Sequence, residues 1–267
     1  MRAVVLHVQL ALAYSSKFIK TRLEYKGDFF LGLVTGVLFQ IITLIFIDVL
    51  FTKNSLTIGG WNKGHVLFIY GFSIFPLNLF FAFFPNLYNI GNKYIIEGHL
   101  DRILLRPLNS LFQVLMEEMD IESLAGLIVG IAIVGYASAQ VNIEWTLVKL
   151  FLFGFMALCG MFIYGGVFIA VASLSFWWPD RIGLMAPLFN MITFGKYPVT
   201  IYNRFLQYVL MWIIPFAFVA FFPSTFFLGF NTYRAYVWLV PVIAIASMTI
   251  GYSVWKMGIR RYESTGS

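Results

Sequence analysis

The residue types that usually carry catalysis or hold metals are sparse in this chain of 267 residues. Its three histidines, His7, His65 and His99, fall in three separate segments, and no H-E-x-x-H pair occurs to bind zinc. No G-x-S-x-G nucleophile elbow occurs either. Gly59 and Gly64 have the spacing of a phosphate-binding loop, but His65 stands where that loop needs a lysine. The sequence therefore argues against hydrolysis of nucleotides, peptides or esters by this chain itself.

The composition indicates the environment in which this chain folds. Hydrophobic residues make up 60% of the chain and charged residues only 11%, against roughly 25% charged in a typical soluble domain. Aromatic residues reach 19%, and the mean hydropathy is +0.84. So few charges cannot cover the surface of a soluble protein of this size. We therefore predict an all-α integral membrane protein, and we read the net charge of +6 as a membrane-topology signal and not as nucleic-acid binding.

Hydropathy predicts six transmembrane helices, each near the roughly 20 residues needed to cross a bilayer. The six runs are 31–51, 66–87, 121–139, 150–174, 205–222 and 236–255. They are apolar on every face, whereas strands of a membrane β-barrel would alternate apolar and polar residues. The single cysteine, Cys159, lies inside the fourth run and cannot form an intrachain disulfide.

The Lys and Arg residues predict the orientation. With the amino end in the cytoplasm, 14 of the 18 basic residues fall in cytoplasmic segments and four outside, as the positive-inside rule requires. Both ends of the chain are then cytoplasmic. The predicted single domain divides as follows: interfacial helix 1–28, spans one and two 29–87, cytoplasmic loop 88–120, spans three and four 121–174, cytoplasmic connection 175–204, spans five and six 205–255, and cytoplasmic tail 256–267.

The amino-terminal stretch 1–28 has two interpretations. The Ala11-Leu12-Ala13 string after an apolar run is typical of a signal-peptide cleavage site. Cleavage there would leave a basic exported end just before a span, against the positive-inside rule. We favour an amphipathic helix in the cytoplasmic headgroup layer, with Gly27 and Asp28 at the bend into the first span.

Ionisable residues are nearly absent from the centres of the predicted spans. Asp48, Glu122 and Lys149 all lie near span edges. A proton- or ion-coupled pump usually needs such groups inside the membrane. We therefore expect the energy for any transport to come from a partner.

The 88–120 loop is the most informative cytoplasmic segment. Its charges are dense and of both signs, and apolar residues are interleaved at helical spacing. This pattern is typical of a helix that docks a soluble partner, although a solvated interfacial loop without a partner would have a similar composition. Pro107 is expected to end the helix at Arg106 or just before it.

The order of residues in this loop resembles that of a known family. The string Gly98-x-x-Asp101-x-x-Leu104-Leu105-Arg106-Pro107-Leu108 is similar to the loop between the second and third spans of ABC type-2 exporter permeases. The similarity is closest to a six-span bacterial subfamily once classed as a domain of unknown function. The amino-terminal helix, the six spans and the Tyr197-Pro198 pair agree with it over essentially the whole chain.

The resemblance implies a mechanism and a set of partners. Permeases of this family pair with a second permease, the same or related, and bind two separate ATPase subunits that hold ATP and Mg²⁺, so no cofactor is expected in this chain. The 88–120 loop would be the coupling loop, with a coupling helix over 95–107 that enters a groove on the ATPase, and Arg102 and Arg106 would form salt bridges there. The implied partner-binding residues are Glu97, Gly98, His99, Asp101, Arg102, Leu105, Arg106 and Pro107. The implied location is the bacterial plasma (inner) membrane, among membrane lipid.

Two further segments leave alternatives open. Residues 181–194 are apolar but too short for a span, so we expect them at the interface or dipping into the bilayer. The outer loop 223–234 resembles the re-entrant turn that closes the outer gate in this family, but a plain hairpin with aromatic anchors explains it equally.

The alternative functions are a membrane scaffold that recruits a partner without transport, and a membrane-embedded enzyme acting on lipid. The sequence offers no clustered acid, base or metal ligands for the second of these. A hydrophobic or amphipathic cargo would suit the aromatic spans, but no residue spacing singles out a path.

Overall fold

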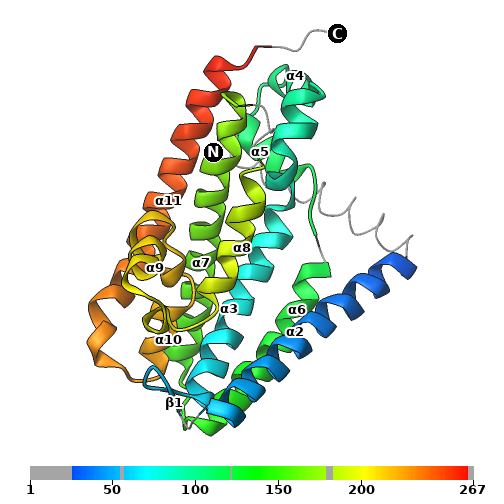
Figure 1. The fold of residues 1–267 in the computed structure, drawn as a ribbon. Coiled ribbons are helices and arrows are strands. Elements are labelled where there is room, and N and C mark those ends of the chain that lie inside the picture. Colours follow the sequence, from blue (N-terminus) through cyan, green and yellow to red (C-terminus); the bar gives the residue numbers. More distant parts are fainter. Residues whose placement is uncertain (1–25, 55–56, 121, 179–182, 264–267) are drawn as a thin grey trace.

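The computed structural model describes residues 26–54, 57–120, 122–178 and 183–263, and they are almost entirely helical (Figure 1). The main helices are α2 (Lys26–Asn54), α3 (Lys63–Phe83), α6 (Glu122–Gln140), α7 (Leu147–Ser173), α8 (Met185–Gly195) and α11 (Arg234–Arg261). Shorter helices fill the connections: α4 (His99–Leu104), α5 (Ser110–Met116), α9 (Arg204–Tyr208) and α10 (Phe221–Phe227). Strands β1 (Thr57–Ile58) and β2 (Trp61–Asn62) form a small antiparallel hairpin.

Five helices are long and apolar enough to cross a membrane, namely α2, α3, α6, α7 and α11. They confirm the predicted all-α membrane fold. The predicted interfacial helix 1–28 lies outside the described residues except for its last three. Gly27 and Asp28, predicted at a bend, are already inside α2.

The bundle has two distinct ends. The hairpin end holds β1, β2 and the turn between α6 and α7, and there Asp48 of α2 forms an ion pair with Lys63 of α3. The loop end holds α4, α5 and the last turn of α11 (Figure 1). Because α2 runs toward the hairpin end and α11 runs away from it, Lys26 and Arg261 both face the loop-end side of the bundle. Which end faces the cytoplasm is a separate question.

The β-hairpin depends on two glycines. Gly59 and Gly60 form the two-residue turn between β1 and β2, with φ values of +58° and +86°. This turn needs a positive φ at both residues, which glycine adopts without strain. Gly59 also lies against Ile201, because a Cβ built on it would be 3.3 Å from the Ile201 side chain. The hairpin thus reaches a segment 142 positions further along the chain.

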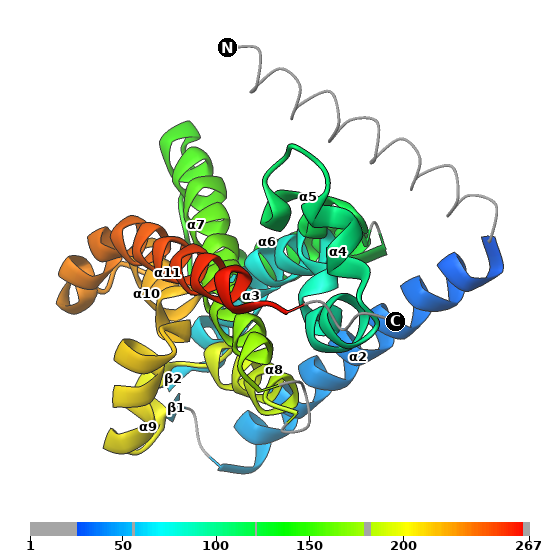
Figure 2. The ribbon, with the colours of Figure 1, turned by 90° about the horizontal axis from the view of Figure 1, so that it is seen from above.

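Helices α7 and α11 run parallel and in close contact (Figures 1 and 2). A Cβ added at Gly166 would lie 2.2 Å from the backbone carbon of Ser247, and one added at Gly251 would lie 2.4 Å from the carbonyl oxygen of Gly166. Small residues allow such approach of helices in lipid, where dispersion contacts replace the hydrophobic effect. Since both helices run from the hairpin end to the loop end, the chain between them must return across the bundle once.

Helix α8 and the residues after it make that return. Phe189 of α8 stacks on Phe81, near the loop end of α3, at 5.9 Å between ring centroids. Eleven residues later, the hydroxyl of Thr200 accepts a hydrogen bond from the indole N–H of Trp61 at the hairpin end, at 2.8 Å. Residues 189–200 therefore run from beside Phe81, near the end of α3, toward the hairpin beside its first residue.

This path bears on two predictions. Residues 175–204 extend along the bundle, because Trp178 follows α7 at the loop end while Thr200 contacts Trp61 at the hairpin end. The predicted fifth span 205–222 is not one continuous helix. It is broken at Pro215 into two arms, 204–213 and 216–227, bent by 75°. Pro215 has no N–H for a helical hydrogen bond and its ring clashes with the preceding turn.

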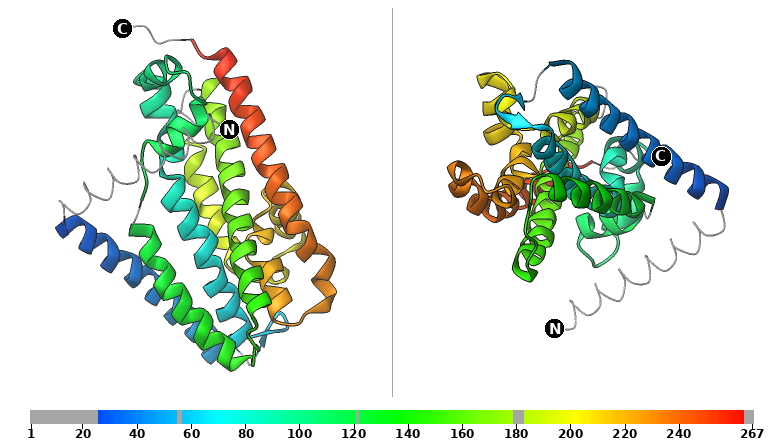
Figure 3. Two further views of the ribbon diagram at one scale, coloured as in Figure 1. Left: turned by 180° about the vertical axis from the view of Figure 1, so that it is seen from behind. Right: turned by 90° about the horizontal axis from the view of Figure 1, so that it is seen from below.

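The bent arms have the geometry of a re-entrant hairpin, because Thr200, just before the first arm, contacts Trp61, and the second arm ends near Trp145 (the arms are yellow and orange in Figure 3). Its tip reaches inward, where Phe216 meets Tyr164 of α7 at 4.8 Å between ring centroids. Its second arm returns until Phe227 packs on Trp145, 5.7 Å away. The bent pair spans 204–227 and so begins well upstream of the loop 223–234, for which the sequence suggested a re-entrant turn or a plain hairpin.

Candidate partner-docking site

The 88–120 loop folds as a series of short helices at the loop end. A π-helical turn (Ile90–Ile96) is followed by α4 and then by α5. The prediction of one helix over 95–107 is therefore wrong. Gly98 has φ +72°, a left-handed conformation that ends the preceding turn and that glycine tolerates best. Of the predicted site residues, Glu97 and Gly98 precede α4, whereas Leu105, Arg106 and Pro107 follow it.

Helix α4 turns one face to the bundle and leaves its carboxyl end exposed. Leu100 and Ile103 are buried, at a spacing of three that puts them on one side of the helix. Leu105, directly after the helix, is 86% exposed, and Leu104 beside it is also exposed. Two neighbouring leucines facing away from the fold form an apolar tip at the end of α4.

A carboxylate on the next segment holds α4 in place. Glu117 accepts hydrogen bonds from the Tyr94 hydroxyl and from Arg102, with the Arg102 Nη2 to Glu117 Oε1 distance at 3.0 Å. Lys93 lies 2.6 Å from Glu118 and 3.9 Å from Glu117. The network joins the π-helical turn and α4 to the residues after α5.

The Tyr94 hydroxyl is a fixed donor in this network. Burial raises the pKa of Tyr94, and the adjacent Glu117 carboxylate raises it further. The phenol therefore stays protonated through the physiological range and keeps donating to Glu117.

Side-chain amides secure the backbone on either side. Gln113 donates to the carbonyl oxygens of Ile103 and Leu108, at 3.2 and 3.3 Å, which closes the turn between α4 and α5. Asn86 donates to the carbonyl oxygen of Val114 at 2.9 Å and so ties α5 to the end of the second span. Backbone carbonyls that the irregular turn leaves unpaired are satisfied in this way.

The last helix joins the same loop from the other side. Trp255 donates its indole N–H to the Ser110 hydroxyl at 3.1 Å, and Asn109 donates to the Tyr252 hydroxyl at 2.8 Å. Beyond α11, burial and the neighbouring Asp101 carboxylate raise the pKa of Tyr262 to about 12. The start of α5 and the first turn of α4 are therefore both in contact with the carboxyl end of α11.

Comparison with known families agrees with this arrangement. A family model described as ABC-2 family transporter protein matches residues 37–266. The chain belongs to the ABC-2 transporter family. No curated protein and no solved structure matches it. Membership makes the chain a permease component of membrane transport and confirms the resemblance drawn from the 88–120 loop.

In this ABC-2 permease the predicted site residues are brought together, but their charges are largely engaged within the chain. Arg102 is bound to Glu117, and Asp101 and Arg106 each have a partner inside the fold. Glu97 and His99 face each other at 3.9 Å, both well exposed. The surface left for a partner is therefore chiefly the apolar tip at Leu104 and Leu105, with charged residues at its rim.

Sequence reasoning missed the residues that position the tip. Glu117 and Glu118 are acidic residues in the same loop as Lys93 and Arg102, so the sequence contained a signal for ion pairs between them. Gln113, Asn86 and Trp255 gave no local signal, because their partners are backbone carbonyls or residues far away in sequence.

The part of the chain that the structure describes contains no group of three His, Cys, Asp or Glu side chains placed to hold a metal ion. The candidate site consists of an exposed apolar tip with a hydrogen-bonded frame behind it.

Proposed function

We propose that this chain is the membrane-spanning subunit of an ATP-driven ABC exporter in a bacterial plasma membrane, and that α4 and its tip dock into separate ATPase subunits. The observation that carries the proposal is Leu105, 86% exposed at the end of a helix whose opposite face, Leu100 and Ile103, is buried against the bundle. An exposed leucine outside the bilayer costs free energy unless a partner covers it, at roughly 25 cal/mol per Å² of apolar surface.

The proposal places the loop end in the cytoplasm. With Arg204 moved to the hairpin end and Lys196 inside the crossing, 12 basic residues remain on the predicted cytoplasmic side and five outside. The positive-inside rule still favours the predicted orientation. Both described chain ends are then on the cytoplasmic side, as we expected from the sequence.

The proposed energy source is outside this chain. ATP and Mg²⁺ would bind to the partner ATPase subunits, and closure of that pair would move α4. The contacts Trp255–Ser110 and Asn109–Tyr252 link the loop to α11, and α11 begins beside the re-entrant hairpin at the other end. A second permease, the same chain or a related one, would complete the translocation path.

A matched pair of substitutions tests the docking. Leu105→Ala removes the tip, and Leu147→Ala removes an equally exposed leucine at the hairpin end. When the ATPase encoded beside this permease is co-expressed and purified through it, we expect Leu105→Ala to weaken retention about tenfold, the equivalent of 1.4 kcal/mol. Leu147→Ala should leave retention unchanged.

Two results would contradict the proposal. Equal retention in both variants would remove the tip as the docking surface. Retention of an ATPase with no substrate-dependent ATP hydrolysis after reconstitution would favour the scaffold, which recruits a partner without transport.

A further inference from the structure

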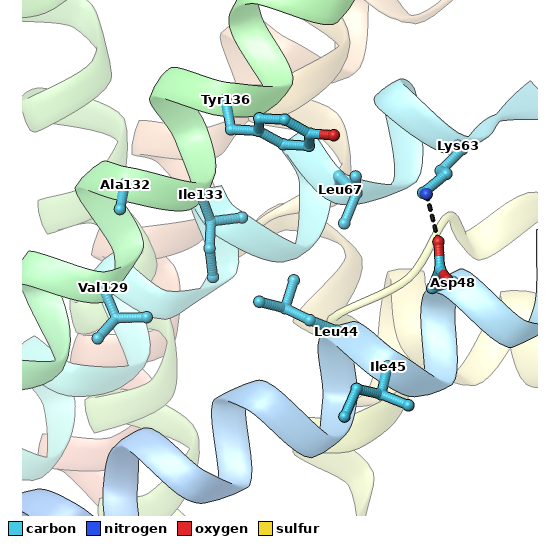
Figure 4. Close-up of a pocket in the computed structure, with 9 residues that line it drawn as sticks. All are labelled: Leu44, Ile45, Asp48, Lys63, Leu67, Val129, Ala132, Ile133 and Tyr136. Atoms are coloured by element: carbon cyan, nitrogen blue, oxygen red, sulfur yellow. Dashed lines mark hydrogen bonds and ion pairs between the residues drawn. The ribbon is translucent and has the colours of Figure 1, made fainter.

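An open groove lies between α2, α3 and α6 near the hairpin end (Figure 4). Its volume is about 490 Å³, within the ~300–1,000 Å³ range of small-molecule sites. Leu67 of α3 and Ile133 of α6 form its buried floor, and Leu44 of α2 and Val129 of α6 face each other across it.

The groove exists because α2 meets the bundle over a short stretch only. Ile47 is fully buried, and Leu44 and Phe51 pack on the core beside it. These three positions are spaced as one helical face. The first half of α2 diverges from α3 (Figure 2), so the gap between the helices opens toward lipid.

The groove is amphipathic along its length. At one end, the Asp48–Lys63 ion pair lies at the rim of the groove. Asp48 is one turn from the end of the α2 span, and Lys63 is the first residue of α3. Val129 lies seven residues before Tyr136 on α6, so Val129 is about 10 Å deeper in the bilayer than Tyr136. Polar groups thus sit at headgroup level and apolar groups below them.

We propose that this groove binds one acyl chain of a zwitterionic phospholipid, whose headgroup is held by the Asp48–Lys63 pair. The pair carries one charge of each sign, and its side chains are 58% and 40% exposed, so both charges are accessible from the membrane surface. The phosphate would face the Lys63 ammonium and the headgroup ammonium would face the Asp48 carboxylate. An anionic lipid would meet Asp48 as a like charge.

This inference does not depend on the ATPase. The phospholipid would fill the space beside α2 with a single ordered molecule and thereby set the angle of α2 to the bundle. The site lies at the end of the bundle opposite to α4, so binding can be measured on the permease alone.

The test uses phosphatidylethanolamine with a photoreactive diazirine in its acyl chain, bound to the purified permease in nanodiscs. Peptide mapping should place the crosslinks on α2, α3 and α6 along the groove. Ala132→Phe, which fills the groove from α6, should reduce them about fivefold, a change of about 1 kcal/mol. Ile128→Phe is the matched control, because Ile128 is on the same helix and 71% exposed, outside the groove.

The headgroup is tested separately, which keeps the proposal falsifiable if Ala132→Phe does not fold. Asp48→Asn leaves the Lys63 cation alone at the rim, so labelling should shift from phosphatidylethanolamine to phosphatidylglycerol. Unchanged headgroup preference, or crosslinks spread evenly over all lipid-facing helices, would overturn the proposal. So would a disulfide-linked dimer formed by Ala132→Cys in a Cys159→Ala background, since a second copy of the chain would then cover the groove.

Discussion

The indole N–H of Trp255, near the end of the last helix, donates to the hydroxyl of Ser110, at the start of α5, over 3.1 Å and 145 positions of sequence. Trp255 is 1% exposed and packs edge-on against Phe176, which follows α7. A buried indole N–H needs a partner, and here the partner belongs to the docking loop. This hydrogen bond, together with that between Asn109 and Tyr252, joins the loop to the last helix.

Removing this hydrogen bond should weaken the joint measurably. We expect Trp255→Phe and Ser110→Ala each to lower the free energy of unfolding by about 1 kcal/mol. The double variant should lose less than the sum, with a coupling of about 0.5–1.5 kcal/mol. Thermal unfolding in detergent gives all three values. Additive losses would show that the two residues stabilise the fold independently.

Glu117 and Glu118 provide a matched comparison within the charged network. Glu117 accepts from Tyr94 and Arg102 and its side chain is 27% exposed, whereas Glu118 is paired with Lys93 and is 43% exposed. We expect Glu117→Gln to cost about 2 kcal/mol, because hydrogen bonds to a charged group are lost. Glu118→Gln should cost less than about 1 kcal/mol, as for an exposed ion pair.

Hydrogen exchange locates this effect. Amides of residues 99–104 should exchange faster in Glu117→Gln and at the original rate in Glu118→Gln. The same acceleration in both variants would mean that charge at this edge, and not the Glu117 contacts, holds α4.

The crossing made by α8 predicts which side of the membrane each loop faces. In a Cys159→Ala background, Arg204→Cys should react with a membrane-impermeant maleimide from the same side as Glu144→Cys at the hairpin end. Leu105→Cys should react only from the opposite side. Labelling of Arg204→Cys from the Leu105 side would restore the fifth span 205–222 and refute the crossing by α8.

The close approach of α7 and α11 predicts unequal effects of two glycine substitutions on one helix. Gly166→Ala places a methyl group within 2.2 Å of the α11 backbone, so the helices must separate at a cost of about 1–3 kcal/mol. Gly154→Ala has nothing within 4 Å of the new Cβ and should be neutral or stabilise α7 by up to about 1 kcal/mol. The unfolding midpoints of the two variants measure these effects. Equal midpoints would show that α7 and α11 do not approach each other closely at Gly166.

Much of the architecture could be predicted because hydropathy reports directly on burial in lipid. The runs 31–51, 66–87, 121–139, 150–174 and 236–255 correspond to α2, α3, α6, α7 and α11 within a few residues. The docking segment was recognisable because its mixed charges interrupt an apolar chain. The break at Gly98 was harder to predict, because a glycine inside an apolar and charged helical pattern does not by itself show a left-handed conformation.

By itself, the sequence determined that this chain lives in a membrane and which of its helices are long enough to cross, and it predicted which loop would dock a partner. Only the tertiary structure decided where the chain crosses between α7 and α11. An apolar run of 18 residues has the same hydropathy whether it crosses the bilayer or enters and returns, and the bend of 75° within 204–227 is compatible with either case. The contact between Trp61 and Thr200 separates the two cases, because residues in contact must lie at the same depth. The same holds for Trp255 and Ser110, whose pairing depends on how distant segments pack.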